Sequence, residues 1–269
     1  MAIETIFGTQ TKLVLVSQTH GSIRVPLNQN FDYTPRFTAR SIFEFDRLDA
    51  AVSISTYEGA DVRFEHLDTD SKLVDSAIGD QDPAATIVLD DPSNYKEIQM
   101  FANIKNSLGI IFQCVLAKGV KIKGSATTTP VREESRVTRD GEALNVQRIK
   151  GGAIEYTRAL DATSTAFDQG AANDGTDSVA VTASGVTTYN LTNTPEFFVN
   201  GKFYLLALVN GTDNDALDSP YTIELGGLAG KTVIISPALG VNDVFELFTV
   251  YSPTRNAITD TITSDAEIV

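Results

Sequence analysis

The chain has 269 residues, a net charge of −14 and one cysteine. This charge argues against a protein that binds nucleic acid by neutralising phosphates, and a single cysteine excludes an intrachain disulfide. A hydrophobic fraction of 42% suffices for a substantial core. No apolar run reaches the roughly 18 residues of a membrane span. The first residues lack the basic and apolar regions of a signal peptide, so we expect folding in the cytoplasm.

The first part of the chain predicts short β-strands. Residues 11–18 form an apolar run with β-branched side chains. Residues 51–67 predict a β-hairpin with Gly59 in its turn, because apolar residues alternate on both sides of that glycine.

A second β-hairpin is predicted within residues 137–149. Asp140-Gly141 is a strong signal for a two-residue turn. Lys150 is followed by Gly151 and Gly152, and this pair predicts a reversal of the chain before the next strand.

One short helix is predicted between Ser93 and Leu108. Ser93 follows Pro92 and is a suitable N-cap, while Ile98 and Phe101 fall roughly on one helical face with Leu108.

Charge and composition divide the chain into two predicted domains. Residues 163–269 contain 3 basic and 13 acidic side chains, whereas residues 1–162 contain 18 and 22. Small polar residues dominate 163–178 and predict a linker. Regular β-like segments in 179–269, separated by turns such as Asn200-Gly201 and Asn210-Gly211, predict an immunoglobulin-like β-sandwich.

Chemistry-bearing residues are sparse. The two histidines, His20 and His66, are expected to be solvated or locally hydrogen-bonded, and a zinc site is not expected. Cys114 lies in an apolar run and is expected to be a buried thiol. Lys231 lies in a Gly-Lys-Thr sequence, but a strand is predicted next where a phosphate-binding loop requires a helix. We therefore expect no enzyme activity and no cofactor.

An acidic loop leaves two readings open. Asp213, Asn214, Asp215 and Asp218 supply several oxygen atoms, which suits either a weak divalent-cation site or a solvated loop. The solvated loop is favoured.

Two segments together resemble the major tail tube proteins of tailed bacteriophages. Residues 37–80 read as strand, hairpin and acidic loop, and residues 132–160 read as a long ribbon, with one short helix between the segments. The resemblance covers 1–162 and implies an antiparallel β-sandwich or barrel with one flanking helix. It implies a virion protein that assembles in the host cytoplasm into stacked, hexameric rings forming a tube. An outward-facing sandwich suits 179–269.

The resemblance also implies partners and site residues. The partners are other copies of the chain and the tape measure, terminator and baseplate or tip proteins, while DNA passes through without specific binding. Acidic side chains facing the lumen would repel phosphates. The lumen-lining candidates are Glu44, Asp46, Glu58, Asp61 and Glu65.

A polar loop is predicted over residues 124–135, before the second ribbon. Such a loop is a suitable arm for contact between rings, and charged residues in and after it can form ion pairs with a neighbour. A disordered surface loop is the competing interpretation. The inter-ring candidates are Arg132, Glu133, Glu134 and Arg136.

Two other function classes stay open. A capsid decoration protein or a host-carbohydrate-binding adhesin would use the C-terminal sandwich as its working part, although the absence of tryptophan counts against sugar binding. A hydrolase using two carboxylates is the weakest alternative, because no pair can be singled out.

Overall fold

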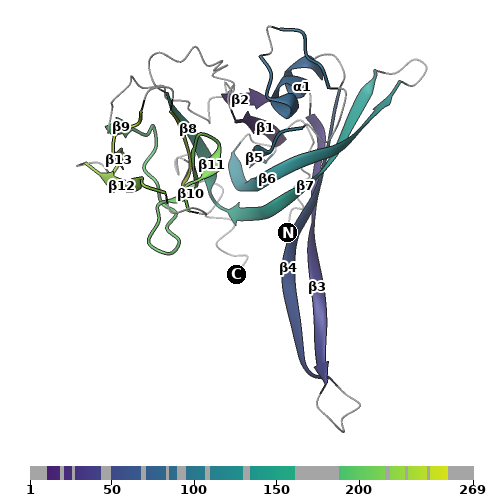
Figure 1. The fold of residues 1–269 in the computed structure, drawn as a ribbon, viewed down its shortest axis with the longest axis horizontal. Coiled ribbons are helices and arrows are strands. Elements are labelled where there is room, and N and C mark those ends of the chain that lie inside the picture. The colour runs from purple at the N-terminus through teal and green to yellow at the C-terminus, as the bar shows by residue number, and fades with distance from the viewer. Residues whose placement is uncertain are drawn as a thin grey trace.

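The computed structural model describes residues 11–18, 21–25, 28–43, 50–67, 71–82, 85–89, 95–106, 110–129, 134–160, 188–215, 219–227, 230–240 and 243–253. Across these residues the protein is mainly β, with antiparallel sheets and one short helix, as the sequence predicts. Figure 1 shows the sheets following one another in layers.

The largest sheet has seven strands in the order β2-β1-β5-β6-β7-β4-β3. Each neighbouring pair runs antiparallel. The strands are β1 (Thr11–Ser17), β2 (Gly21–Arg24), β3 (Asn28–Phe43), β4 (Ala50–Leu67), β5 (Ile98–Lys105), β6 (Ile111–Thr128) and β7 (Arg136–Lys150). β3 and β4 extend together beyond the rest of the sheet as a long ribbon (Figure 1).

Both faces of β1 are buried. Successive side chains of a strand point to opposite faces, so Leu13 and Leu15 pack in one core while Val14 and Val16 pack in another. The first core lies inside the curved seven-stranded sheet and is completed by helix α1 (Ser71–Gly79).

A buried ion pair attaches α1 to the sheet. Arg139 Nη2 of β7 lies 2.5 Å from Asp75 Oδ1 of α1, and the Arg139 side chain is almost fully buried. The pair fixes the helix over the first core.

Two smaller sheets follow on the other side of β1, β5 and β6. A four-stranded sheet has the order β11-β10-β14-β8, and a three-stranded sheet has the order β12-β13-β9. Their strands are β8 (Ala153–Leu160), β9 (Thr188–Asn190), β10 (Tyr204–Val209), β11 (Thr212–Asp213), β12 (Thr222–Gly226), β13 (Thr232–Ser236) and β14 (Val244–Tyr251).

The second core joins the seven-stranded and four-stranded sheets. The ring of Phe101 in β5 lies 6.0 Å from that of Tyr156 in β8 and 5.8 Å from that of Phe248 in β14, centroid to centroid, and the rings of Tyr156 and Phe248 lie 5.0 Å apart. Asn103 of β5 reinforces this contact: its Nδ2 donates to Ile154 O at 3.0 Å, and its Oδ1 accepts from Ile154 N at 2.8 Å. A third core lies between the four-stranded and three-stranded sheets.

The helix predicted between Ser93 and Leu108 is wrong. Residues Ile98–Lys105 form strand β5, and the helix lies earlier, over residues assigned to an acidic loop. The strand is apolar on both faces, because Ile98 and Met100 face the first core while Phe101 faces the second. A continuous apolar run does not distinguish a doubly buried strand from a helix.

Both predicted hairpins are also wrong, because each glycine lies inside one long strand. Gly59 has φ +108° and lies at a bulge where the register between β3 and β4 shifts. Gly141 permits a close approach of strands: a Cβ there would lie 2.7 Å from Lys121 O. The turns at Asn200-Gly201 and Asn210-Gly211 are confirmed, with positive φ at all four residues.

The chain breaks after Lys150 as predicted, with φ +74° at Gly151. The next strand, β8, pairs along its length with β14, so the end of 1–162 shares a sheet with the C-terminal part. The linker 163–178 lies outside the described residues, as do the boundaries themselves. The division into domains and the immunoglobulin-like topology stay proposals.

The shared second core predicts that one mutation weakens both parts of the chain. We expect Phe248→Ala to lower the free energy of unfolding by about 3–5 kcal/mol, because the ring is fully buried and leaves a cavity. Phe198→Ala is the matched control: Phe198 is 57% exposed, and its loss should change stability by less than about 0.5 kcal/mol. Chemical denaturation followed by circular dichroism measures both, and equal effects would contradict the shared core.

Candidate assembly surface

A charged wall forms the outer face of β3, β4, β7 and the second half of β6. In β4, Val62 and Phe64 point into the first core, whereas Asp61, Arg63 and Glu65 point outward. The same alternation in the neighbouring strands completes the wall. Its charged members are Asp32, Arg36, Asp61, Arg63, Glu65, Lys121, Lys123, Arg136, Asp140 and Glu142.

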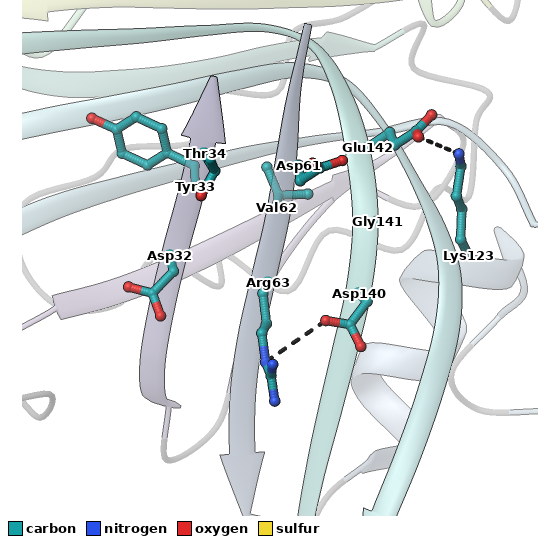
Figure 2. Close-up of a pocket in the computed structure, with 10 residues that line it drawn as sticks. All are labelled: Asp32, Tyr33, Thr34, Asp61, Val62, Arg63, Lys123, Asp140, Gly141 and Glu142. Carbon is teal, nitrogen blue, oxygen red and sulfur yellow. Dashed lines mark ion pairs between the residues drawn. The ribbon is translucent and has the colours of Figure 1, made fainter. Parts of the chain in front are cut away.

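Opposite charges face each other across the strands of the wall. Arg36 Nη1 lies 2.7 Å from Glu142 Oε1 and 3.6 Å from Asp61 Oδ1. Figure 2 shows Lys123 paired with the same Glu142 and Arg63 reaching Asp140. Such exposed pairs are screened by water and contribute little to folding stability, so they organise the surface more than they stabilise the fold.

The wall has no net charge. Its ten charged members are divided equally between acids and bases, and Arg136 Nη1 lies 3.3 Å from Glu65 Oε1 at one end. A shallow depression of about 650 Å³ lies over the wall and is lined by residues of all four strands (Figure 2). Its lining mixes both signs of charge.

The electrostatic centre of the wall is Glu142. Hydrogen bonds from Lys123 and then Arg36 lower the pKa of this carboxyl below its usual value. The hydrogen bond to Glu142 also raises the pKa of the Arg36 guanidinium. Because the folded-state pKa of Glu142 is depressed, its contribution to stability is present above the unfolded pKa and is lost as the pH falls through the folded value.

The wall contains two of the five predicted lumen residues. Asp61 and Glu65 lie on it, each beside an arginine. Glu58 is exposed at the bulge of β4, and Glu44 and Asp46 lie outside the described residues. The prediction from sequence did not include the basic residues of the wall. The position of Arg63 between Asp61 and Glu65 on the same strand face was a signal that acids and bases alternate there.

The predicted inter-ring arm needs a correction. Gly124–Thr128 is not loop but the end of β6, paired with the start of β7. Polar threonines and serine made this strand end resemble a loop. Arg136 belongs to β7 and to the wall, and Glu134 is exposed just before it. Arg132 and Glu133 lie outside the described residues.

The wall has two open edges. Within the part of the chain that the structure describes, β3 pairs with β4 alone. β5 pairs with β6 only as far as Val120, which leaves Lys121–Thr128 with β7 as its single neighbour. Each edge presents backbone N–H and C=O groups that a further strand can pair with.

His20 lies outside the described residues, and the other sequence candidates have structural roles. His66 is buried, stacks on Phe64 and donates from Nδ1 to Leu67 O at 2.9 Å. Cys114 is buried as predicted, and burial raises the pKa of its thiol to about 12. Thr232 begins strand β13 directly after Lys231. The strand predicted there is confirmed, in place of the helix that a phosphate-binding loop requires.

The carboxylates of the acidic loop after β10 are bonded to donor groups of the protein itself. Asp213 Oδ1 accepts from Asp215 N at 2.9 Å, and Asp215 Oδ1 accepts from Tyr204 Oη at 3.1 Å and pairs with Lys202. Asp218 lies outside the described residues. Among the residues that the structure describes, no group of three or more His, Cys, Asp or Glu is arranged to hold a metal ion. No helix in the same residues is long and apolar enough to cross a membrane.

Comparison with known proteins gives weak structural similarity and no match in sequence. No model of a known protein family matches the chain, and no curated protein matches it either. The solved tail tube of SPP1 is 12% identical, with a TM-score of 0.34, covering 54% of this chain and 80% of that one. The tube-terminating cap of the anti-feeding prophage is 7% identical, with a TM-score of 0.36, covering 56% and 95%.

Hcp1 from Salmonella typhimurium is 8% identical, with a TM-score of 0.31, covering 53% of this chain and 87% of that one. TM-scores this far below 0.5 do not establish a common fold.

The charge arrangement of the wall predicts a measurable coupling. We expect Arg36→Gln to raise the pKa of Glu142 toward its ordinary value, because one of its two charged donors is lost. An NMR titration of the Glu142 carboxyl measures the shift. Arg24→Gln is the control, since Arg24 is an exposed arginine of β2, away from the wall. An unchanged Glu142 pKa in Arg36→Gln would contradict the coupling.

Proposed function

We propose that the protein is a structural subunit that assembles with its own copies, edge to edge, into rings that stack as a tube. The observation that carries this proposal is the pair of open edges on the charged wall, one on β3 and one on Lys121–Thr128 of β6. Long exposed edges are templates for pairing with another chain. Because the two edges differ, their contact is head-to-tail, and such contacts generate closed rings or open helices.

The strand directions favour continuous antiparallel pairing. β3, β4, β7 and β6 alternate in direction, so β3 and β6 run in opposite directions. Rotation about an axis along the strands keeps the direction of every copy. β3 of one subunit therefore meets β6 of the next as an antiparallel pair, and the wall continues from copy to copy.

The exposed charges near the two edges have opposite signs, because the other charged residue of β3 on this face, Arg36, is half-buried and paired with Glu142 and Asp61. Asp32 is exposed on β3, whereas Lys121 and Lys123 are exposed on β6, all on the same face of the wall. Joining the edges brings a carboxylate beside two ammonium groups. This complementarity sets the partner and the register more than the affinity.

The order of layers supports one choice of inner and outer surface for such a ring. The charged wall and the four-stranded sheet lie on opposite sides of the first core. A ring closed through the wall has the wall on its inner surface and the two smaller sheets, with β8, on its outer surface. Asp61 and Glu65 then face the lumen, and Glu58, Glu44 and Asp46 remain candidates there.

This inner surface suits the passage of DNA without specific binding. Its paired acids and bases present no net positive charge to phosphates, so the counterion release that drives nucleic-acid binding is small. We propose a bacteriophage tail tube built of hexameric rings, a conduit for the genome without catalysis or cofactor. Its partners are the tape measure, terminator and baseplate or tip proteins.

Reversing the edge charges tests the head-to-tail contact. We expect Asp32→Lys alone to prevent ring formation, because it places like charges together at the edge. Lys121→Asp combined with Lys123→Asp should do the same. Joining all three substitutions should restore rings, as seen by negative-stain electron microscopy and sedimentation velocity.

The matched control is Glu224→Lys, which reverses one charge on β12 in the three-stranded sheet, away from both edges, and should leave rings intact. Circular dichroism shows whether each variant is folded. Rings in both single-edge variants, or no rings after all three changes in a folded protein, would contradict pairing through β3 and β6.

A further inference from the structure

Two turns of the C-terminal part share one dipeptide and one backbone shape. Asn200-Gly201 closes a turn between two residues that are bridged to each other, and Asn210-Gly211 connects β10 to β11. All four residues have positive φ, between 50° and 77°, as in the two-residue turns that join antiparallel strands. The two asparagines therefore have the same following residue and the same local conformation, and any difference between them comes from their surroundings.

The side chain of Asn210 is held by the start of β14 and the residue before it. Its Nδ2 donates to Asp243 Oδ1 at 2.9 Å, and its Oδ1 accepts from Val244 N at 2.8 Å. The backbone is held there too, because Asn210 N donates to Val244 O at 2.8 Å. We call these contacts of Asp243 and Val244 with Asn210 the clamp. Both polar atoms of the Asn210 amide are engaged in it.

The surroundings of Asn200 are open. Asn200 and Gly201 are both exposed, and a Cβ on Gly201 would meet no atom within 4 Å. Among the residues that the structure describes, no hydrogen bond holds the Asn200 side-chain amide. The second turn differs here as well, since a Cβ on Gly211 would lie 3.1 Å from Gln18 Cγ. The first turn is therefore able to move where the second is packed.

An asparagine followed by glycine is open to loss of its side-chain amide in water. The glycine nitrogen gives up its proton and forms a bond to the asparagine Cγ, while the bond from Cγ to Nδ2 breaks and ammonia leaves with that proton. Water then adds to either carbonyl of the five-membered ring and breaks the bond from that carbonyl to the nitrogen. The products are aspartate and isoaspartate, each with one new negative charge, and nothing is oxidised or reduced.

Two structural conditions control the first step. The attacked nitrogen must be accessible, which glycine favours because it has no Cβ. The asparagine side chain must also swing toward that nitrogen, so hydrogen bonds that hold the amide oppose the reaction. Asn200 meets both conditions in the folded protein, whereas Asn210 has to leave the clamp before it can react.

We propose that Asn200 is a site of spontaneous deamidation in the folded protein and that the clamp protects Asn210 from the same reaction. Water is the only co-reactant. The modification goes beyond the tube function and does not depend on it. It adds a carboxylate to a turn whose neighbouring side chains, Phe198 and Val199, are exposed, so the negative charge of the C-terminal part increases as the protein ages.

Peptide mass spectrometry of the purified chain, kept in warm and mildly alkaline buffer, tests the proposal. We expect the amide of Asn200 to be lost at least about tenfold faster than that of Asn210, because Asn210 must first give up its hydrogen bonds. Equal rates at the two asparagines, or faster loss at Asn210, would overturn the proposal.

The same incubation in urea is the matched control. In the unfolded chain the two asparagine-glycine pairs have the same dipeptide and no clamp, so their rates should become similar. A difference that persists in urea would mean that the flanking sequence sets the rates, and it would overturn protection by the clamp.

Asp243→Ala tests the clamp directly, because it removes the acceptor of Asn210 Nδ2. We expect deamidation of Asn210 to become several-fold faster while the rate at Asn200 stays unchanged. Glu224→Ala is the control, since Glu224 is an exposed carboxylate of β12, and it should change neither rate. Circular dichroism shows whether each variant is folded.

An unchanged rate at Asn210 in folded Asp243→Ala would contradict the clamp. If this variant does not fold, the comparison of the wild type in buffer and in urea still decides between protection by structure and protection by sequence. Neither result bears on ring formation, so the tube function stands or falls separately.

Discussion

The alternation of side chains along β1, β5 and β6 is the constraint on which the rest of the molecule depends. These strands bury both faces, so one face of the seven-stranded sheet packs in the first core and the opposite face packs in the second. Leu13 and Val14 are neighbours in sequence and lie in different cores. A shift of one residue in register would exchange the two faces. The same sheet becomes half exposed only at β3, β4, β7 and the end of β6, where alternation instead produces the charged wall.

The sequence predicted the class of fold well and the individual elements less well. Strands with one exposed face, such as Asp61–Phe64, show their period of two directly. β5 does not, because apolar residues on both faces remove the alternation, and it was assigned to a helix. The true helix, Ser71–Gly79, has only a short apolar face. The two glycines predicted to lie in hairpin turns have other roles: Gly59 lies at a bulge and Gly141 allows a close approach of two strands. The asparagine-glycine pairs do form turns.

The candidate surface was foreseen in part. Asp61 and Glu65 lie on one exposed face, as expected from their spacing, but their neutralisation was not foreseen. The partners Arg36 and Arg136 come from other strands, and the register of β3 with β4 that places Arg36 shifts at a bulge directly after it. A bulge moves every later residue of a strand relative to its neighbour. Local patterns carry no information on such shifts, so cross-strand ion pairs cannot be read from one sequence.

The short connection between β7 and β8 has a mechanical consequence. β7 belongs to the charged wall and β8 to the four-stranded sheet, and only Gly151 and Gly152 separate them. A tensile load on the outer sheets therefore passes along the covalent backbone directly into the wall, without first loading the side-chain packing between layers. Antiparallel β14 shares that load with β8 through a continuous run of eight paired residues. In the proposed tube, the charged wall and the four-stranded sheet would resist bending or stretching together.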